Sequence, residues 1–279
     1  MSPELFTRSQ ATERRGGVWD YVSASRLNLW LKCPLAFQLR YVEGVESPVS
    51  PAQFVGKRVH AALEGYYRHR QLGLSIEPEQ LALRIDDDWA NALHEERVQF
   101  ADTAAEEAAY EQTQKVVAAY LAQVPADEPR PLAVEAAIEA PLVDPQSGED
   151  LGLPLVGIID LVMPEAEGPT ITDFKTSARG GEPLEITHEV QLSSYSYLFR
   201  HHAAEPEGAI EILNLTKTKT PRVERYRYAP RDQRHQRRLF AVIRAYLDAL
   251  DSGRFVFRPG FGCSSCEFRT THCQHWCCG

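Results

Sequence analysis

The stretch "LVGIIDLVMPEAEGPTITDFKTSA", residues 155–178, contains two apolar runs joined by a short acidic turn with proline and glycine. The runs at 153–163 and 169–176 have the length and composition of β-strands. Each carries an aspartate, Asp160 and Asp173, and Lys175 follows two residues after the second. Charged side chains beside an apolar sheet core are costly unless a partner compensates them. The pattern therefore indicates that something pairs with the two carboxylates.

Strand geometry groups these charges. Residues two apart in a strand point to the same face, so Asp173 and Lys175 share a face with Ile171, while Phe174 points the other way. If the two runs form a hairpin, Asp160 lies beside Asp173 across the ladder. Two adjacent carboxylates both ionise readily only when a cation lies between them, and Mg²⁺ or Mn²⁺ suits oxygen ligands. A neighbouring ammonium group would position water and stabilise the negative charge that develops on a phosphate.

A surface ion pair between Asp173 and Lys175 would produce the same Asp-x-Lys triplet, and such pairs are common. Asp160 favours the metal site, because it follows four apolar or small residues, "VGII". A bare aspartate in that position needs a structural or chemical reason.

The rest of the chain has the pattern of one α/β domain with helices at its front. Periodicity, caps and breakers predict helices at 23–41, 52–70, 78–123 and 187–202, strands at 132–142, 208–216 and 223–228, and a last helix that opens at Pro230 and stops at Gly253. The two runs of the opening stretch fall between the strand at 132–142 and the helix at 187–202.

Composition limits the function classes. The 279 residues are 43% hydrophobic and carry a net charge of −9, which argues against a nonspecific nucleic-acid coat. No apolar run reaches the ~18 residues of a membrane span, and the N-terminal residues lack a signal-peptide core, so we expect a cytoplasmic protein without membrane contact. Residues 217–238 nevertheless hold nine lysines and arginines. This run is typical of a solvated face but is also compatible with one basic groove.

Six cysteines indicate a metal centre rather than disulfides, because cytosolic chains rarely keep disulfides. Cys263, Cys266 and Cys273 form a C-x2-C-x6-C pattern, and Cys33 is the only cysteine outside the tail. Four thiolates suit either zinc or an iron–sulfur cluster, and the spacing alone does not choose between them. Cys277 could replace Cys273 as the fourth ligand, and Cys277 and Cys278 otherwise fit unliganded thiols.

The ordered motifs resemble those of the PD-(D/E)XK nuclease superfamily, in its RecB-like branch. The resemblance rests on "GIIDLVM…ITDFKT", on "FVGKRVHAALEGYY" around His60, on "QLSSYSYLF" with Gln191 and Tyr195 one helical turn apart, and on "AVEAAIEA" as the first core strand. It implies that His60 is an additional metal ligand beside Asp160, Asp173 and the Phe174 carbonyl. It does not decide whether Glu135 or Glu139 of the first strand takes part.

The same resemblance chooses between the two metal centres. A subset of RecB-like nucleases, which includes AddB-type helicase-nuclease subunits and the exonucleases of CRISPR adaptation, carries a [4Fe–4S] cluster with one N-terminal Cys-Pro ligand and three C-terminal ligands. Cys33-Pro34 with Cys263, Cys266 and Cys273 matches that pattern. The resemblance thus implies an iron–sulfur module that joins the two ends of the chain.

Together these features predict a PD-(D/E)XK restriction-endonuclease-like α/β core, a mixed central sheet flanked by helices, within a single nuclease domain at 1–279. We expect a helical insertion at 61–130, a catalytic core at 131–251, and a segment at 252–279 that forms the iron–sulfur module with Cys33.

The expected activity is that of a Mg²⁺- or Mn²⁺-dependent deoxyribonuclease, an exonuclease on single-stranded DNA ends, in CRISPR adaptation or in DNA recombination and repair. CRISPR-adaptation or helicase proteins would be its partners, and a homo-oligomer is compatible with the resemblance. Lys175 would position water, and Gln191 and Tyr195 would support the site. A path for DNA phosphates would be lined by Lys217, Lys219, Arg222, Arg225 and Arg227. The alternatives are a non-catalytic DNA-binding or assembly module that keeps the fold, and a zinc protein whose acidic pair is a surface ion pair.

Overall fold

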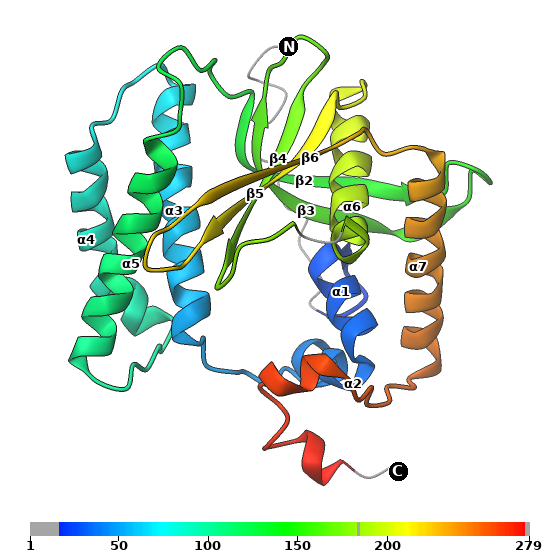
Figure 1. The fold of residues 1–279 in the computed structure, drawn as a ribbon. Coiled ribbons are helices and arrows are strands. Elements are labelled where there is room, and N and C mark those ends of the chain that lie inside the picture. The colour runs from blue at the N-terminus through cyan, green and yellow to red at the C-terminus, as the bar shows by residue number, and fades with distance from the viewer. Residues whose placement is uncertain (1–16, 183–184, 277–279) are drawn as a thin grey trace.

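The structure, a computed structural model, describes residues 17–182 and 185–276. Six strands form one mixed sheet (Figure 1). Strand β3 is antiparallel to β2 and β4, β4 is parallel to β5, and β6 is antiparallel to β5. The bounds are β1 Val22–Ser23, β2 Ala133–Val143, β3 Asp150–Met163, β4 Thr170–Ser177, β5 Ala209–Thr216 and β6 Val223–Tyr228. This arrangement confirms the predicted α/β class with a mixed central sheet.

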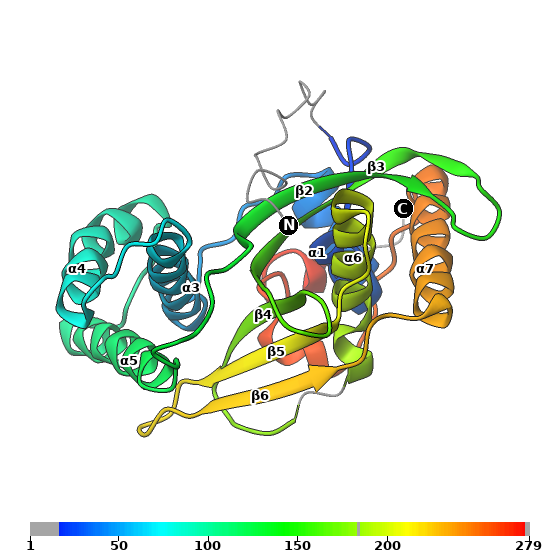
Figure 2. The same ribbon diagram turned by 90° about the horizontal axis from the view of Figure 1, so that it is seen from above.

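Helices cover both faces of the sheet, with α3, α4 and α5 on one side and α1, α6 and α7 on the other (Figures 1 and 2). Every residue of β5 is buried, as expected for a strand covered on both faces. The bounds are α1 Ala24–Lys32, α2 Pro34–Phe37, the π-helix η2 Gln38–Val42, α3 Pro51–Gln71, α4 Pro78–Glu95, α5 Thr103–Leu121, α6 Glu185–Ala203 and α7 Gln233–Ser252, followed by the short 3₁₀ turns η3 Phe261–Ser265 and η4 Cys273–His275.

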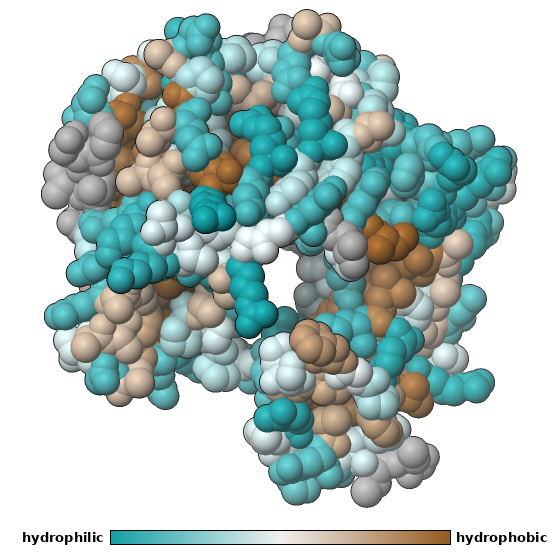
Figure 3. Space-filling model, viewed as in Figure 1, coloured by the Kyte–Doolittle hydropathy of each residue, from teal (hydrophilic) through white to brown (hydrophobic). Residues whose placement is uncertain are grey.

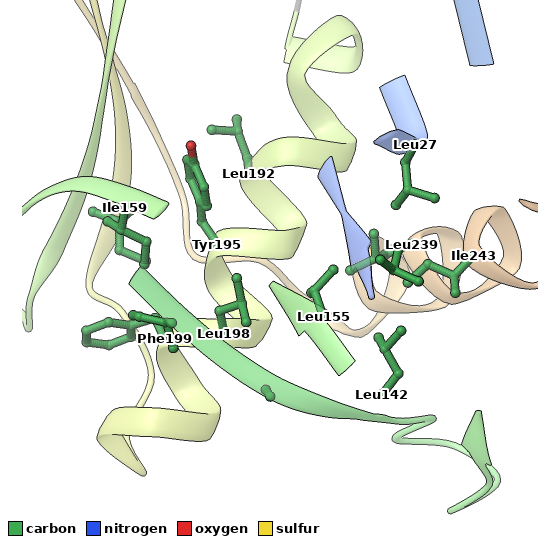
Figure 4. Close-up of a cluster of buried hydrophobic side chains, with 14 of the residues drawn as sticks. Leu27, Leu142, Leu155, Ile159, Leu192, Tyr195, Leu198, Phe199, Leu239 and Ile243 are labelled. Atoms are coloured by element: carbon green, nitrogen blue, oxygen red, sulfur yellow. The ribbon is translucent and has the colours of Figure 1, made fainter. Parts of the chain in front are cut away.

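Each face of the sheet has its own apolar core. On one face, leucines and aromatic residues of α6 and α7 pack against β2 and β3 (Figure 4). Tyr195 belongs to this core, but its hydroxyl group points away from the surrounding aliphatic side chains. On the other face, the core of α3, α4 and α5 contacts Leu161, Phe174 and Leu213. The two cores hold the sheet from both sides and fix the directions of its polar residues.

Two of the predicted helices are interrupted. The prediction of one helix at 78–123 is wrong, because α4 ends at Glu95 and α5 begins at Thr103. Arg97 takes a left-handed conformation (φ 51°), and the Asp102 side chain accepts from the Ala105 N–H at 2.8 Å, which caps a new helix. The predicted helix at 23–41 is broken at Cys33, which is extended (φ −162°) before Pro34.

The last segment of the chain packs against the first helices. Phe268 is buried with Leu35, Ala36 and Leu39 of α2 and η2, and the Leu35 N–H donates to the Val256 carbonyl at 3.1 Å. Figure 1 shows α2 and the C-terminal turns side by side. The segment around Phe268 thus lies beside the first helices of the chain. None of the described helices is both long and apolar enough to cross a membrane.

Candidate active site

A groove of about 1810 Å³ opens where β3 lacks a neighbour along part of one edge. On one edge β3 pairs with β2; on the other it pairs with β1 in its first half and with β4 at its end. Between these two partners, residues 157–160 have no strand neighbour on that edge within the described chain. Gly157, Ile158 and Asp160 therefore face the groove.

A connected segment spans this opening. Strand β1 is anchored on β3, and the chain then runs through α1, α2, η2 and residues 43–50 to α3, which packs against the end of β4. We call residues 24–50 the arch. Ser25, Arg40 and residues 44–49 of the arch line the groove opposite the sheet. Figure 3 shows an opening near the middle of this face, with hydrophilic residues in teal along its left side.

Two glycines bring helices close to the site. A Cβ atom at Gly56 of α3 would lie 2.7 Å from Oγ1 of Thr176 at the end of β4. A Cβ atom at Gly157 of β3 would lie 2.7 Å from Cδ1 of Leu198 in α6. A Cβ atom at either position would require the side chain of Thr176 or Leu198 to move, so both glycines allow a close approach between helix and strand.

Asp160 and Asp173 lie side by side, as predicted. In the β3–β4 ladder Leu161 pairs with Thr172, so the next pair in register is Asp160 with Asp173. The ladder stops there, and the Phe174 N–H donates to Oδ2 of Asp160 at 2.7 Å instead. Burial, and then the Asp173 carboxylate, raise the pKa of Asp160 well above its ordinary value.

Asp173 is the centre of a hydrogen-bond network and is 1% exposed. Lys175 donates to its Oδ1 at 2.9 Å and lies 2.7 Å from its Oδ2. Gln191 of α6 donates to Oδ1 at 3.0 Å and accepts from Lys175 at 3.0 Å. The Tyr195 hydroxyl donates to Oδ1 at 3.3 Å, and its pKa is raised by burial and by the Asp173 and Asp160 carboxylates. The four predicted residues therefore meet as one constellation.

A second group of ligand atoms adjoins the first. Atoms of His60, Glu135 and Asp160 all lie within 4.8 Å of one another, and among the described residues this is the one group of three metal-ligating side chains so close together. Burial lowers the pKa of His60 although the Asp173 carboxylate opposes this, so the ring is neutral and can bind a metal ion. Nδ1 of His60 lies 3.7 Å from Oδ2 of Asp160.

Glu135 is the first-strand acid that the sequence left undecided against Glu139. It faces Asp160 in the β2–β3 register and takes a left-handed conformation (φ 42°), which is strained for a residue other than glycine. Val134 packs with α3 to α5 and Ala136 with α6 and α7, although residues two apart in a regular strand share a face. The kink between them directs the Glu135 carboxyl group to the groove.

The donor set suits a hard divalent ion. Two carboxylates and one imidazole converge, with the Asp173 carboxylate next to Asp160, and oxygen-rich sets of this kind bind Mg²⁺ and Mn²⁺. Burial, and then the Glu64 carboxylate, raise the pKa of Glu135 to about 7. Oδ2 of Asp173 is buried beside Lys175 but accepts no hydrogen bond of acceptable geometry. The acids thus lack enough positive charge among the described residues, which a divalent ion would supply.

The basic residues that the sequence grouped as a DNA path are divided between two places. Lys217 lines the groove, and its ammonium group donates to the Ala52 carbonyl at 2.7 Å. Arg225 and Arg227 lie on the opposite face of the sheet from Asp173, paired with Glu211 and Glu165. Lys219 and Arg222 belong to the β5–β6 turn and do not line the groove. Only one of the five predicted residues is therefore near the carboxylates.

Four cysteines gather where the two ends of the chain meet. Burial, and then the neighbouring thiols of Cys33, Cys266 and Cys263, raise the pKa of Cys273. The Arg258 N–H donates to Sγ of Cys33 at 3.4 Å. Cys33, Cys266 and Cys273 pack against the buried Phe268 and its neighbours. Cys277 and Cys278 lie outside the described residues.

A family model described as "PD-(D/E)XK nuclease superfamily" matches residues 21–274. Among solved structures, the chain resembles a protein from Eubacterium rectale named "Putative exonuclease", with a TM-score of 0.58 and 13% identity over 96% of this chain and 93% of that one. That likeness shows a shared fold. A second solved structure, SSO0001, is 16% identical over 81% of this chain and 85% of its own, but its TM-score is only 0.36. No curated protein matches the sequence.

Proposed function

Because the chain belongs to the PD-(D/E)XK nuclease superfamily, we propose that it is a divalent-metal-dependent deoxyribonuclease that hydrolyses the phosphodiester bonds of single-stranded DNA from an end. The observation that carries the proposal is the contact between Lys175 and Asp173 beside Asp160, at the stretch of β3 that opens into the groove. The name of the E. rectale protein supports an exonuclease.

In this proposal His60, Glu135, Asp160, Asp173 and the Phe174 carbonyl hold the ion. Bound there, Mg²⁺ or Mn²⁺ would polarise the phosphate and lower the pKa of the attacking water. The protein contributes fixed positions, since Asp160 is held by the Phe174 N–H and Asp173 by Gln191 and Tyr195. These bonds orient the carboxylates before DNA binds, and such preorganisation is a large part of electrostatic catalysis.

Lys175 is the residue that we assign to the reacting phosphate. Its ammonium group is held between Asp173 and the Gln191 side-chain oxygen, 3.0 Å from the latter. From there it can orient the water and stabilise the charge that grows on phosphorus. Tyr195 keeps its proton because its pKa is raised, so it acts as a hydrogen-bond donor that positions Asp173.

We further propose that Cys33, Cys263, Cys266 and Cys273 hold a [4Fe–4S] cluster. Support comes from the mutual proximity of the thiols and from the N–H donor to Cys33. The cysteine pattern also supports a setting in CRISPR adaptation or in recombination and repair.

The test is degradation of end-labelled single-stranded DNA with Mn²⁺ by protein purified without oxygen. We expect Asp173→Ala and Lys175→Ala each to reduce the rate by about 10²-fold or more, because each removes charge stabilisation at the reacting phosphate. Lys115→Ala, which alters an exposed lysine of α5, should keep the wild-type rate. If the intact, metal-loaded wild type binds DNA without cutting it, the chain is a DNA-binding module on a nuclease fold.

A further inference from the structure

A carboxylate holds two cations together at the mouth of the groove. Glu96, at the end of α4, places Oε2 at 2.7 Å from Nζ of Lys57 and Oε1 at 3.2 Å from Nη2 of Arg58. All three residues line the groove that contains His60 and Asp160. The side chains of Arg58 and Glu96 are only 18% and 17% exposed, so their contact is partly desolvated, whereas the Lys57 side chain is 52% exposed.

The two cations lie on the same helix as a proposed metal ligand. Lys57 precedes His60 by three residues on α3, which is about 4.5 Å along the helix axis and nearly one turn. Lys57, His60 and Glu64 form a stripe at helical spacing along the groove. A DNA strand with one phosphate at the carboxylates would therefore have a neighbouring phosphate within reach of Lys57 and Arg58.

The contact has the geometry of phosphate binding. Two oxygens of one anionic group each receive a different cation, as two non-bridging oxygens of a backbone phosphate would. The Arg58 guanidinium donates to Glu96 through Nη2. Its plane is supported by Phe54, with 5.4 Å between the guanidinium carbon and the ring centre.

We propose that Lys57 and Arg58 form the binding site for one backbone phosphate next to the scissile phosphate, and that Glu96 occupies this site as an internal phosphate mimic until DNA displaces it. The inference rests on the proposed function but concerns a different part of the groove. Because backbone phosphates carry no sequence information, the site sets the position of the strand and not the sequence that is cut.

The proposal is tested by binding of a labelled single-stranded oligonucleotide, measured by fluorescence anisotropy over a range of salt concentrations in an Asp173→Asn background with Mg²⁺. The double variant Lys57→Ala/Arg58→Ala should bind more weakly. The negative slope of log K against log salt should become smaller in magnitude by about 0.7, the value for one lost phosphate contact on a single strand. Glu96→Gln should bind about fivefold more tightly, because the phosphate no longer competes with an ion-paired carboxylate.

Two comparisons make the result specific. Glu95→Gln removes an equal charge from the adjacent residue, which also lines the groove, and should change affinity less than Glu96→Gln does. The gain from Glu96→Gln should also vanish when Lys57 and Arg58 are both alanine. Melting temperatures confirm that each variant is folded.

Equal effects of the Glu95 and Glu96 variants, or an unchanged salt slope in the double alanine variant, would overturn the phosphate site. Wild-type protein that still degrades the strand in that case leaves the proposed function standing. Wild-type protein that neither binds nor cuts single-stranded DNA removes the proposed function itself.

Discussion

Glu135 and Asp160 are two acids whose pKa values are raised in the folded protein, chiefly by burial. Ionising them therefore opposes folding unless a cation is present. For Glu135 the stabilising contribution is present below its ordinary pKa of 4.5 and is lost as the pH rises through about 7. The metal-free protein is therefore destabilised most above about pH 7, where Glu135 is ionised and can bind a metal ion.

We expect the melting temperature of the chelator-treated protein to decrease by several degrees between pH 5 and pH 8, and Mn²⁺ to restore it at pH 8. The full pKa difference corresponds to roughly 3 kcal/mol, and partial solvent access reduces this. Glu135→Gln should flatten the pH dependence and weaken the effect of Mn²⁺. Glu139→Gln is the matched control on the same strand, and an equal effect of both substitutions would exclude Glu135 from the metal site.

Strand periodicity predicts that Asp173 and Lys175 share a face and that Asp160 lies beside Asp173. Gln191 and Tyr195 are predicted from the resemblance of their motif to the family's, and helical spacing then places them on one face. The sequence could not choose Glu135 over Glu139, since a regular strand places residues four apart on the same side. A kink at Glu135, with its positive φ, makes the difference. The sequence also could not predict that Arg225 and Arg227 pair with acids on the face of the sheet opposite Asp173. The number of basic residues in a run does not indicate which acids from distant segments pair with them.

At the scale of elements, the distance between α3 and β4 decides where His60 lies. Gly56 is four residues before His60, and a Cβ atom there would lie 2.7 Å from Oγ1 of Thr176, so a side chain fits only if Thr176 moves. Gly65, on the same helix, would place a Cβ atom at an ordinary 4.0 Å from Leu81. A methyl group would therefore meet a close contact at Gly56 but not at Gly65 of the same helix.

We expect Gly56→Ala to lower nuclease activity by moving α3 away from β4, with a loss of stability of about 1–3 kcal/mol from overpacking. Gly65→Ala should keep the activity and raise stability by up to about 1 kcal/mol, because alanine favours the helix. Combining Gly56→Ala with Thr176→Ala should recover part of the loss. Activity assays and thermal melts check these outcomes, and full activity of Gly56→Ala would show that the close approach does not position His60.

Most elements could be predicted from periodicity, and the boundaries of β6 and the stop at Gly253 agree with the structure. The break between α4 and α5 could not, because residues 96–102 contain neither proline nor glycine. It is made by an Asp102 cap and by contacts of Glu96 with another helix. Such long-range contacts override the local preference for a helix.

At the scale of the whole molecule, the four cysteines of the proposed cluster come from two segments that are about 230 residues apart in the sequence. Cys33→Ser should lower the melting temperature by about 10 °C and remove absorbance near 400 nm, since metal binding contributes directly to folding stability. Cys277→Ser should leave both unchanged. If Cys277→Ser loses the absorbance and Cys273→Ser retains it, the fourth ligand must be reassigned.

The arch has a topological consequence. If the proposed function holds, a DNA strand bound in the groove would lie between the sheet on one side and the arch on the other, and the arch is anchored at β1 and at Gly56. Such a strand would have to be threaded from a free terminus, and the enzyme would not dissociate sideways between cuts. A closed single-stranded circle should therefore resist digestion while the linear form of the same sequence is degraded processively, as gel electrophoresis of both substrates would reveal. Equal rates on circle and line would mean that the arch opens.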